Sequence, residues 1–566
     1  MPWTELPPGL ILLLGGVLAA ISPRPLRQAL MLGLPVLGFW QLTTLQHGSY
    51  ATASLFGMEL VGSRIDALSL VWGYIFYIAA FGAALFHLHV RDRMQDVAAL
   101  TYMGSAIGAV FAGDLMTLFI YWELTAITSV FLVFANRTDA SFRAGIRYLI
   151  VQIASGVLLM GGLVLYWRGT GSLAFGQIGL DAPGGVMILL GFGIKAAFPL
   201  FHAWLPDAYS RATPTGTVFL SSFTTKMAIY TLARGFPGAE ELVWIGVVMV
   251  LFTLVLAALE NDLRRVLAYC LNNQLGFMVV SIGIGTELAL NGAAAQAFAH
   301  ILYKGLLFMV VGSVLTAAGT AKASELGGLA RSMPWTATFG IIAAAAISTP
   351  FFCGFVSKSL ILSAVAKDGS GFVWGVLLFA SAGVFLVSGV RVVHAAFFAA
   401  PATPRAEPVG EAPWNMRLAM AFVAALCIAV GVMPGELYAI LPYAMDYDPY
   451  TASHILTQFQ LLAFSVLAYF WLRRLGLWPA DRPVTVLDVD AIYRGPLHRA
   501  WRRMVEWGSE TSGLLTGGLR RWVEAVAGLA ERLGGPQGIF GGATSTGNAV
   551  VWLTALLGLY LLIFVA

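Results

Sequence analysis

The chain has 566 residues, of which 58% are hydrophobic and only 11% are charged, and its mean hydropathy is +0.80. Soluble globular domains carry about 25% charged residues, so this composition excludes a soluble globular protein. The formal net charge of +4 says little about partners, because the positions of charges matter more than their sum in such a chain. Cys270, Cys353 and Cys427 lie in apolar segments without ligand spacing, so we expect no disulfide framework and no metal site.

Apolar runs long enough to cross a bilayer recur along almost the whole chain, which predicts an all-α polytopic membrane protein. The run from Gly9 to Ile21 has no basic flank before it, so we interpret it as the first span and not as a cleavable signal. The predicted spans lie near residues 9–22, 27–45, 65–90, 95–112, 115–135, 142–167, 185–209, 214–235, 240–259, 264–284, 291–318, 333–366, 371–398, 413–433, 452–473 and 547–565.

The loops between these spans alternate in their content of basic residues. One set holds Arg24, Arg27, Arg91, Arg93, Arg137, Arg143, Arg147, Arg264, Arg265, Lys322, Arg331, Arg405, Arg473 and Arg474. The opposite set is poorer and holds mainly Arg64, Arg168, Arg234 and Lys367. The positive-inside rule predicts that the richer set is cytoplasmic and that the N-terminus faces outward. The expected location is a bacterial inner membrane.

A more polar segment follows the fifteenth predicted span. Residues 488–533 read DVDAIYRGPLHRAWRRMVEWGSETSGLLTGGLRRWVEAVAGLAERL, in which tryptophans and leucines alternate with arginines. This pattern predicts one or two amphipathic helices at the cytoplasmic interface, with arginines toward anionic headgroups. A solvated cytoplasmic linker is the alternative.

Ionisable residues at membrane depth cost roughly 2.5–3.5 kcal/mol each on insertion scales, so each is a functional candidate. The candidates for proton or ion translocation are Glu123, Lys195, His202, Lys226, His300, Lys304 and Lys358. Asp114 is interpreted as an interfacial cap. A single lysine near a span end usually snorkels, and a lone histidine usually packs. Charges of both signs in several separate spans instead predict a path for ions or protons.

Prolines mark the predicted helix breaks at Pro199, Pro206 and Pro350. Broken backbone is tolerated in a bilayer only where protein or a watery cavity satisfies it. Lys195 precedes Pro199, whereas Lys358 follows Pro350, and this mirrored order is expected of halves related by a two-fold axis in the membrane plane. We therefore expect each break to admit water near a titrating lysine.

Five segments resemble the antiporter-like membrane subunits shared by respiratory complex I and multisubunit Mrp-type Na+/H+ antiporters. They are YWELTAITSVFLV at Tyr121, KAAFPLFHAWLPDAYSRATPT at Lys195, FTTKMAIYTLARG at Phe223, HILYKGLLFM at His300 and FFCGFVSKSLI at Phe351. The resemblance covers roughly residues 60–400, and FLSSFTTKMAIYTLARGF looks closest to the Mrp D-type subunit.

The resemblance implies fourteen core helices with two inverted five-helix repeats that contain the broken helices. The implied repeats are 95–235 and 240–398. Together with the pattern of apolar spans they predict N-terminal helices in 1–94, peripheral helices in 399–480, an amphipathic segment in 481–540 and a final span in 541–566. It also implies roles: Glu123 pairs with Lys195, Lys226 links the half-channels, His300 and Lys304 continue the relay, and Lys358 is the outer-channel group.

Burial disfavours the charged form of a lysine, and a nearby carboxylate favours it, so opening the Glu123–Lys195 pair would push a proton onward.

We expect protons as cargo, with Na+ as a candidate exchanged cation. The expected partners are the lipid bilayer and other membrane subunits of a hetero-oligomeric complex, and no nucleic acid, metal or cofactor. No nucleotide or redox motif is present in the sequence, so we expect an ion-translocating membrane protein and not an enzyme. Membership of a complex I-type or hydrogenase assembly, and support of inorganic-carbon uptake, are the alternatives.

Overall fold

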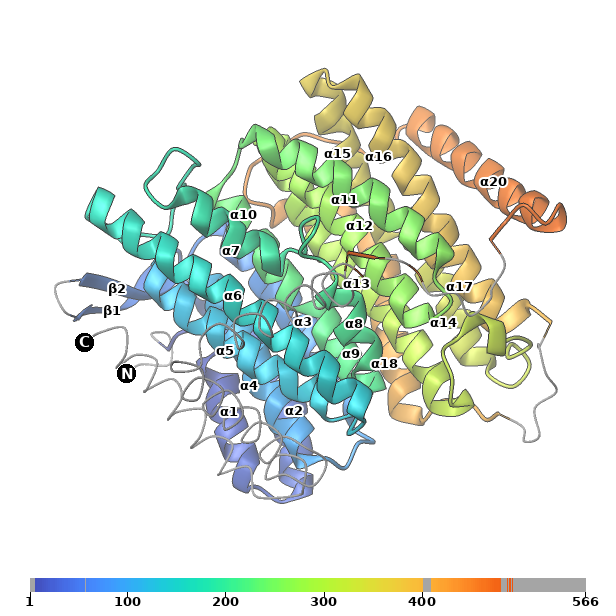
Figure 1. The fold of residues 1–566 in the computed structure, drawn as a ribbon, viewed down its shortest axis with the longest axis horizontal. Helices are drawn as coiled ribbons and strands as arrows, with labels where there is room; N and C mark the ends of the chain where they lie inside the picture. The colour runs from blue at the N-terminus through green and yellow to red at the C-terminus, as the bar shows by residue number, and fades with distance from the viewer. Residues whose placement is uncertain are drawn as a thin grey trace, which may run out of the picture.

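The computed structural model describes residues 6–55, 58–400, 409–479, 486, 488, 489 and 491. The predicted final span, and the predicted amphipathic segment apart from its few described residues, lie outside the described residues. In the described part the chain forms a packed bundle of helices (Figure 1). Nine of the helices described there are long and apolar enough to cross a membrane. The prediction of an all-helical polytopic membrane protein is confirmed, except for one small hairpin.

The first half of the bundle holds the hairpin and ten helices. Their bounds are α1 (Leu10–Ile21), α2 (Arg24–Thr44), β1 (Gly48–Leu55), β2 (Met58–Ile65), α3 (Ala67–His87), α4 (Arg93–Phe111), α5 (Leu115–Phe134), α6 (Asp139–Thr170), α7 (Gly185–Lys195), α8 (Trp204–Arg211), α9 (Pro214–Ser222) and α10 (Thr224–Gly235).

The second half follows the same pattern of long and interrupted helices. Its elements are α11 (Glu240–Leu259), α12 (Leu263–Ile284), α13 (Glu287–Ala318), α14 (Pro334–Ala345), α15 (Cys353–Asp368), α16 (Gly371–Val384), the π-helical turns η3 (Phe385–Val390) and η4 (His394–Phe398) around α17 (Arg391–Val393), α18 (Trp414–Val432), α19 (Pro434–Ala439) and α20 (Ala452–Arg474). Each predicted span up to residue 473 coincides with one helix or with consecutive helical segments.

Acidic and hydroxyl side chains fix where several helices begin. Asp66 caps α3, Thr138 caps α6 and Asp262 caps α12, each by accepting a backbone N–H from the first turn. Asp114 caps α5 by accepting from Thr117 N at 2.7 Å. The interpretation of Asp114 as a cap is therefore confirmed.

The hairpin of β1 and β2 was not predicted from the sequence. The two strands pair antiparallel between α2 and α3. The segment has no Asn-Gly or Asp-Gly signal at its turn. Tertiary contacts hold it: Val61 N donates to Asp114 Oδ2 at 2.7 Å, and Gly113 N donates to Val61 O at 3.0 Å.

The loops gather at two ends of the bundle. At one end, which we call the basic-loop end, four contacts join successive loops: Arg137–Asp92, Asn136–Arg211, Arg264–Ala212 and Ala323–Asn261. The other end, which we call the hairpin end, is joined by Arg64–Asp66, Arg234–Asp66, Ile178–Gly235 and Gly238–Ile282. The alternation of basic loops predicted from the sequence thus corresponds to a physical separation.

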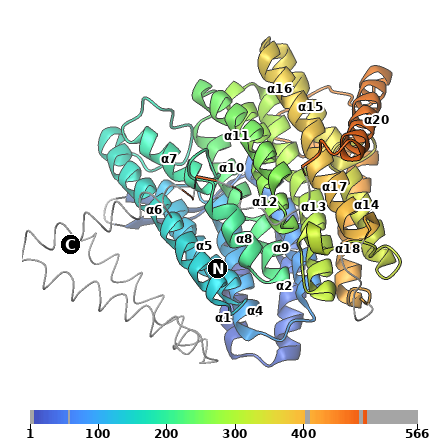
Figure 2. The same cartoon turned by 45° about the vertical axis from the view of Figure 1, so that its right-hand side comes forward.

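Helix α13 occupies the centre of the bundle, where it contacts α3, α9, α12, α14, α15 and α18. Its residues from Ala289 to Val314 are buried, polar ones included. By contrast α20 lies at the edge in both views (Figures 1 and 2), and of its side chains only Leu462 and Tyr469 are buried. Polar side chains on α13 therefore face protein and are kept away from lipid.

Candidate functional site

The first broken helix is interrupted between Lys195 at the end of α7 and Trp204 at the start of α8. Ala197 and Leu200 have φ values of 59° and 73°, a left-handed conformation that ends regular helix. The Trp204 indole N–H donates to the carbonyl oxygen of Ile194 at 3.0 Å, and that oxygen also accepts from Ala197 N at 3.1 Å. Side chains of the protein thus satisfy backbone that lipid could not.

The prolines of this segment have different effects. Pro199 lies inside the break, as predicted. Pro206 lies in the first turn of α8, where a backbone N–H has no helical partner in any case. Pro206 therefore shapes the start of α8 and does not itself interrupt the helix.

The second broken helix is interrupted between α14 and α15. Pro350 lies in this break, and Phe351 has a left-handed φ of 70°. Gly354 N donates to Ala346 O across the break at 3.1 Å. A third interruption, at Phe223 between α9 and α10, contains no proline and was missed. All three breaks adjoin a predicted lysine.

Lys195 is fully buried and lies beside the predicted glutamate without contacting it. Its Nζ donates to the carbonyl oxygen of Trp122 at 2.5 Å and lies 4.3 Å from the centroid of the Trp122 ring. Glu123, the next residue of α5, interacts with Lys195 electrostatically. The ion pairs within 4 Å in the described part do not include these two. Glu123 and Lys195 are therefore close enough to interact electrostatically but do not form a direct ion pair, and we call this arrangement open.

Helix α6 leaves room for the Glu123 carboxylate. Gly156 faces it so closely that a Cβ on residue 156 would overlap Glu123 Oε1. Next to Gly156, Ser155 accepts from the Trp122 indole at 3.0 Å and donates to Gly191 O at 2.7 Å. These contacts align α5, α6 and α7 around the Glu123–Lys195 pair.

The substitution Gly156→Ala is expected to displace the Glu123 carboxylate and leave the fold intact, because the side chain that must move is flexible. A misplacement of this kind is expected to lower proton flux in vesicles by about tenfold. Gly375→Ala is the matched control, since a Cβ there meets nothing within 4 Å. Equal flux in the two variants would contradict the prediction.

Lys226 is fully buried at the first turn of α10, next to the third interruption. Its Nζ donates to Ser221 O at 2.6 Å, which satisfies a carbonyl at the end of α9. The carbonyl oxygen of Lys226 accepts from the Trp72 indole at 2.9 Å. The break therefore holds the ammonium inside the bundle, where it cannot snorkel to an interface.

Three further predicted groups lie on α13 and α15. Lys304 Nζ donates to Ser388 Oγ of η3 at 3.0 Å, and Lys358 Nζ donates to Ser348 Oγ at 2.8 Å. His300 is fully buried, and neither ring nitrogen has a hydrogen-bond partner in the described part. His300 interacts electrostatically with Lys226, Lys304 and Lys358. Lys226, His300, Lys304 and Lys358 thus lie together in the interior of the bundle.

Other buried polar groups missed by sequence reasoning surround this cluster. Gln274, Gln296, Tyr303 and Ser357 form a hydrogen-bonded network across α12, α13 and α15. Buried polar atoms without a partner in the described part occur along the same helices and in the first half of the bundle, at Glu123, Gln152, Thr225, Asn272 and His300. Buried polar groups are normally satisfied by protein or by water. This distribution is suited to a hydrated path.

His202 lies in the first break, 1% exposed, with its ring edge-on to Phe252 of α11 at 4.5 Å between centroids. Its Nε2 lies 2.8 Å from Oδ1 of Asp488, which is also buried. The sequence places these residues 286 positions apart. Sequence reasoning singled out His202 but not its partner, because nothing in the pattern around residue 488 links it to the break.

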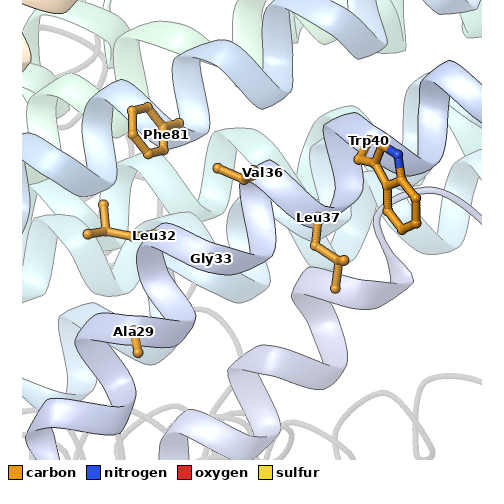
Figure 3. A pocket seen from close by; sticks show the side chains of 7 residues that line it. All are labelled: Ala29, Leu32, Gly33, Val36, Leu37, Trp40 and Phe81. Atoms are coloured by element: carbon orange, nitrogen blue, oxygen red, sulfur yellow. The ribbon is translucent and has the colours of Figure 1, made fainter.

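One surface groove of the described part lies apart from this cluster. Its volume is about 570 Å³. Figure 3 shows its lining residues on α2 and α3: Ala29, Leu32, Gly33, Val36, Leu37, Trp40 and Phe81. Its lining has no ionisable side chain. It offers apolar surface and no proton chemistry.

Comparisons with known proteins identify the family to which this chain belongs. The family described as NADH:quinone oxidoreductase/Mrp antiporter, TM, matches residues 112–386. The N subunit of the NADH-quinone oxidoreductase from Desulforudis audaxviator is 31% identical over 418 residues, which are 67% of this chain and 81% of that protein. The chain belongs to this family of antiporter-like membrane subunits. Its members are ion-translocating membrane subunits, some of them within oxidoreductase complexes.

Other relatives are larger than the region they share with this chain. A probable A/B-type component of a K+/H+ antiporter from Rhizobium meliloti is 32% identical over 66% of this chain and 40% of that protein. The hydrogenase-4 component B of Escherichia coli is 28% identical over 65% of this chain and 62% of that protein. The chain therefore matches less than two thirds of the length of these two relatives.

Solved structures share the fold. A chain of the membrane-bound sulfane sulfur reductase, an archaeal respiratory membrane complex, superposes with a TM-score of 0.71 at 22% identity, covering 99% of this chain and 100% of that chain. A chain of the Mrp complex from Dietzia superposes with a TM-score of 0.67 at 19% identity, covering 84% and 99%. Both confirm a polytopic membrane fold of the antiporter-like type.

Proposed function

We propose that the protein is a proton-translocating, D-like subunit of an Mrp-type Na+/H+ antiporter. The observation that supports this most is the interior cluster of Lys226, His300, Lys304 and Lys358, with the Glu123–Lys195 pair on neighbouring helices. All five basic groups are almost completely buried. Intramembrane ionisable groups that face a bundle interior mark ion pathways and proton relays.

In the proposed mechanism the Glu123–Lys195 pair is a toggle. When the carboxylate approaches, it stabilises the charged ammonium of Lys195. When it withdraws, burial favours the neutral amine, and the proton moves onward toward Lys226. The open arrangement described above corresponds to the second state. Interruption of three helices beside the lysines supplies backbone polar groups that would stabilise water in transit.

From Lys226 the proposed path continues through His300 and Lys304 to Lys358. His300 and Lys304 are four residues apart on α13, so they share one face of that helix. Electrostatic interactions join Lys226 to Lys304 and Lys304 to Lys358. The inverted repeats in 95–235 and 240–398 would place the two broken helices at opposite halves of this path.

The proposed setting is a hetero-oligomeric complex in a bacterial inner membrane, with the basic-loop end cytoplasmic and the N-terminus outside. The exchanged cation would be Na+.

A proton-pumping subunit of a complex I-type or hydrogenase assembly is the second candidate, and the similarity to the N subunit of NADH-quinone oxidoreductase and to hydrogenase-4 component B favours it. A proton-coupled partner in inorganic-carbon uptake is a lesser alternative. Identification of the proteins that copurify in mild detergent would separate these assemblies.

The experiment measures proton flux with a pH-sensitive dye in vesicles containing the purified complex. Glu123→Gln is expected to lower the flux by about tenfold, because losing about 1.4 kcal/mol of preference between two charge states corresponds to a factor of ten. Glu287→Gln, at an exposed carboxylate in the first turn of α13, is the control and is expected to retain wild-type flux. Wild-type flux in Glu123→Gln would refute the toggle.

A further inference from the structure

Asp488, which follows α20 in the sequence, is buried and places a carboxylate beside the first broken helix. Asp488 Oδ1 contacts His202 Nε2 at 2.8 Å, and its Oδ2 accepts from the Tyr269 hydroxyl at 2.7 Å. Oδ1 also accepts from the backbone N–H of Val489 at 2.6 Å. Both carboxylate oxygens therefore accept hydrogen bonds, from α12, from the adjacent backbone and from the helix break.

The contact with Asp488 determines which nitrogen of the His202 ring carries the hydrogen. An ionised carboxylate can only accept hydrogen bonds, so His202 Nε2 must be the donor in this contact. In the neutral ring the lone pair is then on Nδ1. That atom is buried and has no hydrogen-bond partner in the described part. Nδ1 is thus the atom of His202 that is free to take up a proton.

The charges around Asp488 favour that uptake. Tyr269 also contacts Arg265 at 3.4 Å, and Arg265 pairs with Glu260 at 2.7 Å, so these two charges cancel. Asp207 of α8 is paired with Arg147 at 2.6 Å, and Arg264 donates to Ala212 O. The negative charge of Asp488 faces only His202 and a neutral hydroxyl among these groups. A proton on His202 would compensate it.

We propose that His202 is a proton-loading site at the basic-loop end of the path and that Asp488 positions it. Asp488 holds the Nε2–H tautomer and stabilises the imidazolium that forms when Nδ1 binds a proton; loss of that proton from Nδ1 restores the neutral ring. Helix α8 runs from the break to Arg211 at the basic-loop end, and Tyr269 is on the second turn of α12, which starts there. This inference rests on the proposed function of proton translocation.

The test compares Asp488→Asn with the wild type in vesicles of the purified complex, with the pH on each face varied independently. The asparagine keeps the size of the side chain and loses its charge. We expect flux to fall by about tenfold and its pH profile to move toward lower pH by about one unit on one face only, because His202 then binds its proton less tightly. Asp181→Asn, at an exposed carboxylate, is the matched control.

A second variant guards against a simple loss of folding. Tyr269→Phe keeps the carboxylate and removes one of its donors, so a smaller shift of the pH profile is expected, toward higher pH, because the carboxylate then holds more of its charge for His202. An unchanged profile in both variants, even with less folded protein, would overturn the positioning role. If Glu123→Gln lowers flux in the same preparation while both profiles stay unchanged, this inference fails and the proposed function stands. If Glu123→Gln also has wild-type flux, the proposed function fails.

Discussion

Replacing Lys226 with methionine is expected to stop proton translocation, with a fall of about 10²-fold or more, the usual contribution of a positioned proton-transfer group. Lys226 is fully buried, and its electrostatic neighbours Lys304 and His300 follow it in the proposed path. Methionine matches the length of the side chain and packs well in apolar surroundings. The measurement is proton flux per folded complex in vesicles.

Two companion variants separate proton transfer from charge. Lys226→Arg keeps the positive charge, but a guanidinium does not release its proton, so its flux is expected to be as low as that of the methionine variant. Lys322→Met removes a lysine whose side chain is 54% exposed and is expected to retain wild-type flux. Full flux in Lys226→Arg would show that Lys226 supplies only a fixed charge.

The largest expected effect on stability is at Arg391. This side chain is 1% exposed, and its guanidinium donates to the carbonyl oxygens of Ala257, Ala258 and Glu260 at 2.6–3.2 Å. It thus satisfies the carbonyls at the C-terminal end of α11, which have no helical partner. Arg391→Met is expected to lower the free energy of unfolding by about 3 kcal/mol, because hydrogen bonds to charged groups contribute about 1.5–3 kcal/mol each.

Thermal unfolding of the complex in detergent measures this effect as a lower midpoint for Arg391→Met. Arg168→Met is the matched control, because Arg168 is a helical arginine near the end of α6 that is exposed. Its midpoint is expected to equal that of the wild type. Similar midpoints for the two variants would mean that the α11 carbonyls find other partners at no cost.

Much of this fold could be predicted because the bilayer imposes a simple length rule. Within the described residues, each predicted apolar run coincides with a helix or with consecutive helical segments, and the runs that contain Pro199 and Pro350 form two helices with a break between them. Several loops of the basic-rich set are also joined to one another at one end of the described bundle. These features depend on local composition, which a single sequence displays directly.

The features that were missed depend on tertiary contacts. Phe223 interrupts a helix without a proline, and the break is stabilised by the Tyr102 hydroxyl, which accepts from Thr224 N at 3.0 Å. The hairpin is stabilised by its contact with Asp114 at the start of α5. Asp488 reaches its partners across more than two hundred residues. No local pattern contains such information.

The candidate site was predicted in its residue types and only partly in its pairing. Lys195, Lys226, His300, Lys304 and Lys358 were singled out because charges are expensive in apolar spans, and all of them are buried. Their immediate partners were not foreseen. Lys195 contacts the Trp122 carbonyl, and Lys304 and Lys358 contact serine hydroxyls. Neutral partners of this kind are too common in a sequence to be recognised in advance.

The absence of nearby carboxylates around the interior lysines, among the residues that the structure describes, limits how many protons these lysines can hold at one time. In the described structure, Lys226, Lys304 and Lys358 contact a carbonyl or hydroxyls, and their electrostatic neighbours include no carboxylate. Two adjacent ammonium groups would therefore repel each other without a counter-charge. Three such lysines favour a state in which only one of them is protonated. A proton that arrives at one lysine is then bound only after the proton on the next lysine has moved on. Transport would then advance in strict single file, one charge per step.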